Sequence, residues 1–225
     1  RKFISNISHD FRSPLTSIRG YVQAMVDGVI PPESQQKYLD IILFETDRLT
    51  KLTSNLLDVN NFDKDNIFLD ISRFNLHDSI RKTAGALEGV AAKKDIHFDL
   101  ELSDTEPLWV SGDKDKIQQV LHNLMDNAVK FSHEGSSILI STREKGNRVF
   151  VSVKDSGIGI PKDDLGKIFE RFYKTDLSRG KDKLGTGLGL SICKEIITAH
   201  KQNLDVVSTE GVGSEFVFTL TKETE

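Results

Sequence analysis

The sequence predicts a helical hairpin followed by an α+β sandwich, in which helices cover one face of a mixed sheet. In residues 1–60, apolar side chains recur at steps of three, four and seven residues, the spacing of amphipathic, coiled-coil-like helices. Beyond residue 68, short stretches that alternate apolar and polar residues come between longer stretches of helical periodicity. Elements of both kinds in one chain favour a layered α+β arrangement.

The length of 225 residues suits one large domain or two small ones, and the net charge of −4 argues against nucleic acid as the main partner. The single cysteine, Cys193, excludes an internal disulfide and fits a reducing compartment. No apolar run approaches the roughly 18 residues of a membrane span, and no secretory signal is present. Because the chain begins almost at its first helix without a capping residue, we expect a fragment of a longer protein. The absence of a membrane span and the single cysteine favour a soluble, cytoplasmic fragment.

The first helix is predicted from the start of the chain to about Asp27, and it carries His9 next to Asp10. Its apolar seam comprises Ile4, Ile7, Phe11, Leu15, Ile18, Val22 and Met25. At about 100° per residue, His9 points away from this seam, and Ser13 shares its outward face. Pro14 should bend the helix. An exposed imidazole beside a carboxylate suits chemistry at a ring nitrogen; the alternative is a surface histidine on a packing helix.

Gly28 and Pro31-Pro32 end the first helix, and a second is predicted from about Glu33. Its apolar positions include Leu39, Ile42, Leu49, Leu52, Leu56 and Val59. Ile42, Leu49 and Leu56 are spaced by seven residues, as are Leu52 and Val59, which is heptad spacing. One hairpin cannot enclose its own seam, so we expect a homodimer in which two hairpins form a four-helix bundle. Packing of the hairpin against the rest of its own chain is the alternative.

Polar and charged residues from Asn60 to Asn66 predict a linker, which divides the chain into domains 1–66 and 67–225. In the second domain, helices are predicted over 78–92, from Asp113 to Phe131, and after Thr186. Strands are predicted over 74–76, 97–102, 108–110, 138–142, 149–153, 204–207 and 215–220.

On the helix that Asp113 opens, Asn123, Asn127 and Lys130 form one polar row beside an apolar row. Amide oxygens suit a Mg²⁺ ion that keeps most of its water, and a lysine suits phosphate. The alternative, which the row taken alone favours, is a solvated helix edge.

Two glycine-containing segments carry further binding potential. Asp155–Pro161 follows a strand, and its carboxylate and glycines allow a hydrogen bond and a close backbone approach to a flat ligand; a plain glycine turn is the alternative. Gly185–Leu190 leads into a helix, whose N-terminal N–H groups and dipole favour phosphate. A dinucleotide fingerprint needs a preceding strand and a Walker loop needs Gly-Lys-Ser/Thr, and neither is present.

An aromatic segment, Ile168–Lys174, precedes the second glycine segment and is equally explained as a hydrophobic anchor. The polar stretch from Thr175 to Lys183 predicts a mobile flap hinged near Gly166 and Gly185. Gly211–Phe216 predicts a hairpin turn.

Together these segments resemble the ordered sequence boxes of bacterial sensor histidine kinases of two-component systems. S-H-D-F-R-S-P-L-T around His9 resembles the H-box, and Q-V-L-H-N-L-M-D-N-A-V-K-F-S resembles the N-box. D-S-G-I-G-I-P resembles the G1 box, I-F-E-R-F-Y-K the F-box, G-T-G-L-G-L the G2 box, and G-V-G-S-E-F the last glycine pair. The resemblance covers essentially the whole chain. It implies a dimerisation and histidine-phosphotransfer hairpin followed by a two-layer Bergerat-type (GHKL) ATP-binding domain.

The resemblance implies that ATP phosphorylates His9, with Asp10 as the general base, and that the phosphoryl group passes to an aspartate of a response regulator receiver domain. It implies membrane attachment only through segments upstream of this chain. Ser13 stands where the family has Thr or Asn to orient the water that dephosphorylates the regulator. A serine lacks the methyl group that stiffens threonine, so a weaker phosphatase activity is expected.

The resemblance also implies an ATP site in which Asn127 holds Mg²⁺, Lys130 contacts phosphate, Asn123 supports both, and Asp155 accepts from the adenine amino group. The other ATP-binding residues that it implies are Phe131, Gly157, Gly159, Arg171, Tyr173, Lys174, Gly185, Thr186, Gly187, Leu188 and Gly189. Phe131 replaces a tyrosine that is frequent in the family, so a hydroxyl contact is lost there while ring packing remains.

Two other functions are considered. ATP-hydrolysing relatives of the gyrase and chaperone type place a glutamate base where this chain has Asn123, which argues against hydrolysis. A non-catalytic dimeric scaffold is disfavoured because His9, Asp10, Asn127 and Asp155 are all present.

Overall fold

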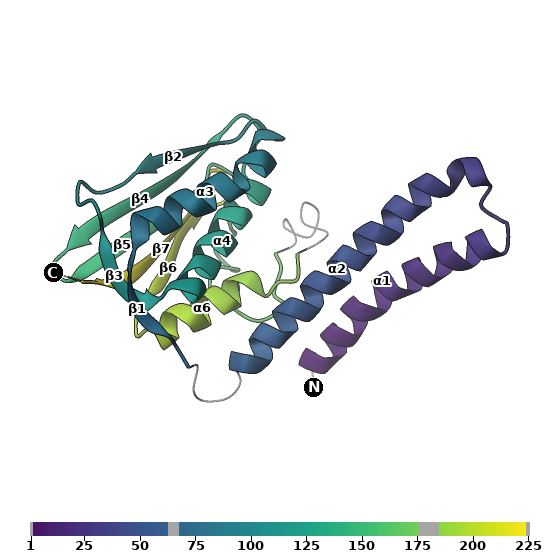
Figure 1. Cartoon of the computed structure of the whole chain (residues 1–225), viewed down its shortest axis with the longest axis horizontal. Helices are drawn as coiled ribbons and strands as arrows, with labels where there is room; N and C mark the ends of the chain where they lie inside the picture. Colours follow the sequence, from purple (N-terminus) through teal and green to yellow (C-terminus); the bar gives the residue numbers. More distant parts are fainter. Residues whose placement is uncertain (1, 63–67, 176–184, 224–225) are drawn as a thin grey trace. The chain divides into compact units, whose positions relative to one another are not determined.

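The computed structural model describes the backbone of residues 2–62, 68–175 and 185–223, and the side chains of these ranges except 2–10, 51 and 54–62. The chain forms two compact units, Arg1–Asp63 and Lys64–Glu225 (Figure 1). The predicted linker begins later than expected, because Asn60 to Phe62 still belong to a helix. Residues 63–66 of that linker lie outside the described residues.

The first unit is the predicted helical hairpin. It consists of α1 (Lys2–Val26), a short 3₁₀ helix η1 (Pro32–Ser34) and α2 (Gln35–Phe62). α1 ends in a left-handed glycine, Gly28 (φ 69°), and the N–H of Val29 donates to the carbonyl of Ala24 at 2.9 Å. This is how a glycine commonly closes a helix C-terminus, because it adopts that conformation without steric penalty.

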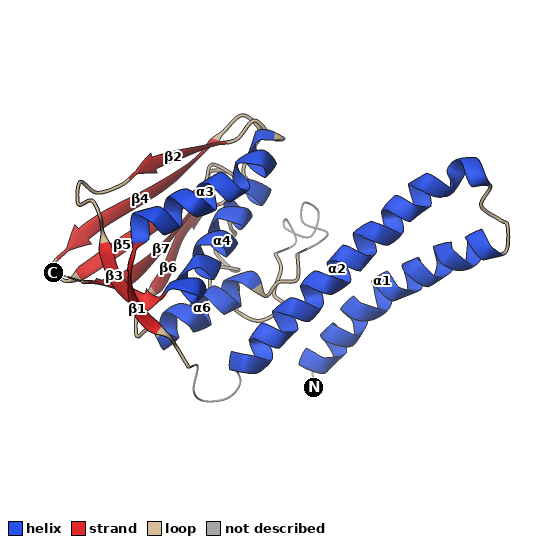
Figure 2. Ribbon diagram, in the orientation of Figure 1, coloured by secondary structure: helices blue, strands red, loops and turns tan. Residues whose placement is uncertain are grey.

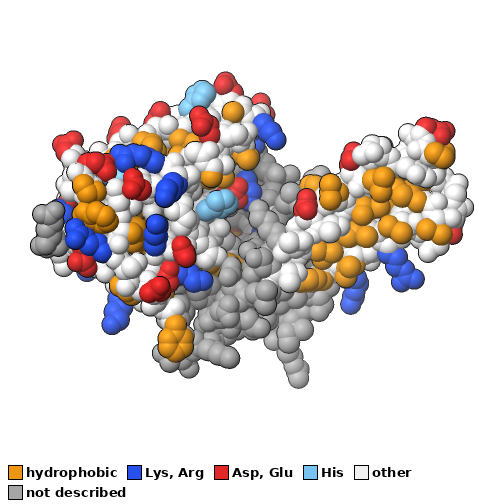
Figure 3. Space-filling view, in the orientation of Figure 1, with side chains coloured by type: hydrophobic (Ala, Val, Ile, Leu, Met, Phe, Trp, Pro, Cys, Tyr) orange, Lys and Arg blue, Asp and Glu red, His pale blue; other side chains and the backbone are white. Residues whose placement is uncertain are grey.

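Hydrophobic side chains remain uncovered along the hairpin, on one side of both helices in the space-filling view (Figure 3). Leu43 is 63% exposed and Phe44 is 44% exposed, whereas few of the side chains described in this unit, such as Leu52, are buried. The other large exposed apolar side chains among those described are Leu15, Val22, Val26, Val29 and Leu39. An apolar patch of this extent is typical of a surface that another protein covers.

The second unit contains a seven-stranded sheet in the order β1-β3-β7-β5-β4-β2, with β6 paired to β7. The pairing of β2 with β4 is parallel and all other pairings are antiparallel, so the sheet is mixed, as predicted. The strands are β1 (Ile71–Asn75), β2 (His97–Glu101), β3 (Trp109–Asp113), β4 (Ser137–Lys145), β5 (Arg148–Lys154), β6 (Leu204–Thr209) and β7 (Gly213–Lys222).

The helices described in this unit lie on one face of the sheet (Figure 2). They are α3 (Leu76–Ala92), α4 (Lys114–Phe131) and α6 (Gly189–Ala199). Their apolar faces and the inward residues of the strands make the core, whose largest fully buried side chains include Phe218, Leu76, Ile80, Leu121 and Ile192. The α+β sandwich is therefore confirmed, and its helices are all in one layer.

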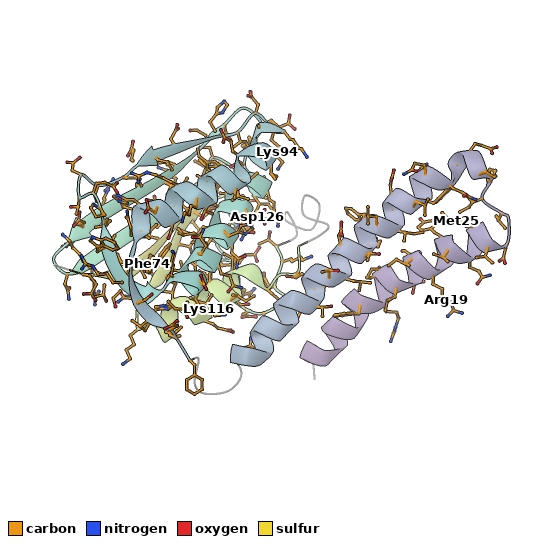
Figure 4. All side chains as sticks on the ribbon, in the orientation of Figure 1. Arg19, Met25, Phe74, Lys94, Lys116 and Asp126 are labelled. Carbon is orange, nitrogen blue, oxygen red and sulfur yellow. The ribbon has the colours of Figure 1, made fainter. Side chains whose placement is uncertain are left out.

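Side chains at the helix ends explain where the elements begin. Leu76 was predicted in a strand but opens α3, because the Asn75 side chain accepts the N–H of His77 at 3.1 Å and caps the helix. Asp113 caps α4 in the same way, as expected. At the other end of α4, Lys94 (labelled in Figure 4) donates to the carbonyls of Val129 and Lys130 at 2.9 and 2.8 Å. A cation at a helix C-terminus is favourable.

Among the described residues, no helix is both long and apolar enough to cross a membrane.

Candidate nucleotide site

The polar row of α4 lies beside its buried face. Asn123, Asn127 and Lys130 are each partly exposed, whereas the neighbouring apolar residues Ile117, Leu121, Leu124 and Ala128 are buried. The Asn123 amide donates to the carbonyl of Gly189 at 3.4 Å, and Lys130 pairs with Asp126 at 2.8 Å. The row therefore runs along the rim of the helix layer and contacts the residue that begins α6.

The C-terminal end of α4 is joined to the segment that follows β5. The carbonyl of Phe131 accepts the N–H of Ile158 at 3.2 Å, and Ser132 forms a bridge with Gly157. A Cβ atom at Gly157 would collide with the Phe131 carbonyl, so glycine is required for this close approach. The N-box and G1 segments, far apart in sequence, thus share one junction.

Asp155 stands at the end of β5 and is the best-defined polar group of the site. Its side chain is buried, and Oδ1 accepts the N–H groups of Gly157 at 3.0 Å and Ser214 at 3.2 Å. Burial raises the pKa of this carboxyl, while the two backbone N–H donors and the nearby His133 oppose the rise. The backbone holds one oxygen in place, and Oδ2 receives no hydrogen bond within the described part of the chain. Oδ2 can therefore accept one from a ligand.

The last glycine pair forms the predicted hairpin turn between β6 and β7, and it also supports Asp155. A Cβ atom at Gly213 would collide with the carbonyl of Asp155, and one at Gly159 with the carbonyl of Thr209. Both glycines have positive φ, 144° and 65°. These contacts fix the G1 turn against the β6–β7 turn, and side chains at either glycine would separate them.

The second glycine segment packs against the end of the aromatic segment. The N–H of Phe172 donates to the carbonyl of Gly187 at 2.9 Å, and Gly187 has φ 70°. Thr186 is buried, and its hydroxyl accepts the N–H of Leu188 at 3.3 Å. Gly189 then begins α6, so the backbone N–H groups at the start of this helix belong to the glycine segment, as the sequence predicts.

The polar side chains of the aromatic segment are engaged with the protein. Arg171 pairs with Glu195 on α6 at 2.9 Å, and the Tyr173 hydroxyl donates to Asp164 at 2.6 Å. Lys174 and Gly185 are partly exposed on either side of residues 176–184. Those residues, which include most of the predicted flap, lie outside the described residues. Gly166, the predicted first hinge, lies among the turns that precede the aromatic segment.

Three partners of these site residues carried no signal in the sequence. They are Ser214 at Asp155, Asp164 at Tyr173, and Glu195 at Arg171. Ser214 lies in a segment that the glycine pattern identified. It donates through its backbone N–H, however, and any residue other than proline could do the same. Asp164 and Glu195 are ordinary charged residues whose roles depend on packing.

The segment around His9 lies in the N-terminal half of α1. His9 and Asp10 are helical, and their side chains lie outside the described set. Ser13 is exposed, in agreement with its predicted outward position, and α1 continues through Pro14 as one helix.

A carboxylate beside glycines, an amide-and-lysine row and a glycine-started helix on one α+β unit are the features expected of a nucleotide-binding domain. Residues 112–224 match the family model of histidine kinase-, DNA gyrase B- and HSP90-like ATPases, and residues 1–64 match the His Kinase A (phospho-acceptor) domain. The chain therefore belongs to the sensor histidine kinases and contains both parts of their catalytic core.

Sensor kinases with similar sequences match nearly the whole chain. It is 37% identical to the sensor histidine kinase WalK of Bacillus subtilis over 98% of this chain and 36% of WalK. It is 35% identical to the sensor protein SrrB of Staphylococcus aureus, over 99% of this chain and 38% of SrrB. The chain thus spans little more than a third of the length of these relatives.

A solved structure of the histidine kinase ThkA in complex with the response regulator protein TrrA superimposes with a TM-score of 0.80 and 31% identity. The match covers 99% of this chain and 61% of that one.

Proposed function

We propose that this chain binds ATP, transfers the γ-phosphoryl group to His9 and passes it on to an aspartate of a response regulator. The observation that carries the proposal is that α4 contacts both glycine segments. It contacts the G1 segment through Phe131 and the G2 segment through Asn123, so one helix holds both segments in the same unit. Family membership and the ThkA complex with its regulator support the two transfer steps.

In the proposed complex, the adenine lies at Asp155, whose Oδ2 accepts from the amino group. Gly157 and Gly159 allow the base to approach the backbone, and Phe131 packs near it. At the other end, the N–H groups of Gly185, Thr186, Gly187 and Gly189 bind phosphate with Lys130 and Lys174, while the Leu188 N–H donates to the Thr186 hydroxyl and holds the loop in shape. Arg171 and Tyr173 hold the chain beside this end. Phosphoryl transfer depends mostly on such positioning and charge neutralisation.

The donor set also fits Mg²⁺. The ion binds one or two protein oxygens, keeps several waters and takes the rest of its ligands from phosphates. Asn127 is partly exposed on the polar row of α4 and offers one neutral amide oxygen. Among the described residues no cluster of three or more His, Cys, Asp or Glu side chains could hold a metal by itself, which agrees with a site completed by the nucleotide. When bound, Mg²⁺ would neutralise phosphate charge.

On the hairpin, Asp10 takes the proton from one ring nitrogen of His9 while the other nitrogen attacks the γ-phosphorus. A nitrogen–phosphorus bond forms, the bond to the bridging oxygen breaks, and ADP leaves. We propose that residues 1–66 form this phosphotransfer domain and residues 67–225 the ATP-binding domain. We further propose that the core works in the cytoplasm, attached to the upstream membrane anchor of a longer sensor.

Incubation with Mg²⁺ and ATP labelled at the γ-phosphate tests the proposal. Label on the protein identifies a kinase, free labelled phosphate identifies an ATPase, and neither product identifies a scaffold. A receiver domain added after labelling should then take up the label, as phosphotransfer requires.

The isolated hairpin, residues 1–62, is expected to be dimeric. The exposed side chains of Leu43, Phe44 and Leu15 need a partner surface, and a second hairpin supplies one by forming a four-helix bundle. Sedimentation equilibrium at micromolar concentration should give twice the monomer mass. Leu43→Lys should shift the equilibrium to monomer, whereas Gln36→Lys, at an exposed polar position of the same helix, should not. A monomeric parent hairpin would contradict the bundle.

Ser13→Ala is expected to abolish dephosphorylation of the regulator while leaving autophosphorylation intact. The exposed hydroxyl of Ser13 can hold the attacking water, and alanine cannot. Ser13→Thr should raise the rate, because its methyl group restricts the side chain and positions the water better. The measurement is loss of label from purified phospho-regulator with ADP present. Equal rates for Ser13→Ala and the parent would show that another group holds the water.

A further inference from the structure

An ion pair between Arg171 and Glu195 ties the aromatic segment to α6. Nε and Nη2 of Arg171 both lie 2.9 Å from the same oxygen, Oε1 of Glu195. The two side chains are 26% and 25% exposed. A partly buried pair with two donors is screened less by solvent than a surface pair, so it can hold a backbone segment in place.

The segment that this pair holds is the one in contact with the glycine loop. Phe172, the residue after Arg171, donates its N–H to the carbonyl of Gly187. The approach is so close that a Cβ atom at Gly187 would lie 2.8 Å from the carbonyl carbon of Phe172. Any shift of residues 171–173 must therefore shift Gly187 as well.

Two unfavourable features coincide at this contact. Phe172 has φ 65°, a left-handed conformation that is unusual for a bulky residue. Within the described part of the chain, Oε2 of Glu195 is buried and receives no hydrogen bond. Neither feature stabilises the fold, and local costs of this kind concentrate where the geometry serves a function.

We propose that Glu195 is a positioning residue for the phosphate end of the nucleotide. It acts through Arg171, which keeps residues 171–173 against Gly187 and so sets where the N–H groups of Gly187–Gly189 point. Binding of the polyphosphate chain depends on this arrangement. Binding of the adenine at Asp155 does not depend on it. The inference rests on the proposed binding of ATP.

Titration of Glu195→Gln with adenosine, ADP and ATP tests the proposal. Glutamine keeps the length of the side chain but removes the charge that holds the guanidinium. We expect ATP and ADP affinities to fall about tenfold, the effect of one weakened charged hydrogen bond, with adenosine affinity unchanged. Arg171→Gln should cause a similar loss, and the double variant should lose little more than either single one, because both act through one contact.

A matched control is the ion pair between Glu144 on β4 and Lys222 on β7, whose side chains are similarly exposed, 18% and 26%. Glu144→Gln should leave all three affinities as in the parent. If Glu195→Gln unfolds in a thermal melt, Arg171→Lys tests the same contact, since lysine cannot bring two guanidinium donors to Oε1; it should show the same selective loss.

Equal loss of adenosine and ATP affinity would show a purely structural role and overturn the inference, as would additive losses in the double variant or unchanged ATP affinity. A parent protein that fails to bind ATP would instead overturn the proposed function itself, and this inference with it.

Discussion

Replacing His9 by glutamine is expected to abolish incorporation of label from γ-labelled ATP. The proposed nucleophile is lost, whereas the proposed nucleotide site comprises α4, the G1 turn and the G2 segment of the other compact unit. ATP affinity, measured by calorimetry, should therefore equal that of the parent. In the parent, the label should be labile to acid and stable to base, as a phosphoramidate is.

Glutamine keeps polarity and approximate size at position 9, so the helix should persist. His97→Gln is the matched control, because His97 is an exposed histidine on the edge strand β2. It should label like the parent. Undiminished labelling of His9→Gln would place the phosphoacceptor elsewhere and end the proposed mechanism.

Asp155→Asn is expected to weaken ATP binding by about ten- to a hundredfold, the value of one hydrogen bond to a charged group. The asparagine oxygen can still accept from the N–H groups of Gly157 and Ser214, so the turn should survive. Its NH₂ group, however, replaces the acceptor oxygen and meets the adenine amino group donor to donor. Calorimetric titration with ATP measures the loss.

The same carboxyl predicts a pH dependence. Burial raises the pKa of Asp155, so on acidification it takes up a proton at a higher pH than an ordinary aspartate. The protonated form no longer accepts freely, and ATP affinity should fall as the pH falls through that raised pKa. The ATP affinity of Asp155→Asn should lack this pH dependence. Subtracting the pH profile of the variant from that of the parent removes the contribution of the nucleotide's own phosphates.

Asp205→Asn, at an exposed position on β6, serves as the control for Asp155→Asn and should bind ATP like the parent. An unchanged ATP affinity of Asp155→Asn would show that Asp155 only shapes the turn and that the adenine binds at another part of the unit.

The type and order of the elements could be predicted because they depend on local periodicity. Apolar residues at steps of three and four produced α1, α2 and α4, and alternation produced β4 and β5. The errors lie at the element ends, where one side chain decides. Asn75 caps α3, which begins two residues earlier than the pattern implied, and α2 continues to Phe62 past the polar pair Asn60-Asn61. Helical backbone in a polar stretch is invisible to a hydrophobic pattern.

The residues of the proposed nucleotide site could also be selected from the sequence, because glycines, Asp155 and the amide row have chemical requirements that residue type alone expresses. The backbone approaches at Gly157, Gly159 and Gly213 are too close for any side chain, so the presence of glycine at these positions indicates a close contact. What these contacts join remained hidden, because a backbone partner such as the carbonyl of Thr209 has no residue preference.

The sequence by itself therefore determined the class of this protein: a histidine on an amphipathic hairpin, and an α+β unit with the glycine and amide signals of an ATP site. Only the tertiary structure decided which charged side chains act together. Glu195 pairs with Arg171. The fully buried His77 lies between Thr142 and Glu106. Hydrogen bonds from Arg81 and His77 lower the pKa of the Glu106 carboxyl to about 2. Such pairs join elements distant in the chain, and their strength depends on distance and burial, which arise only when the helices pack on the sheet.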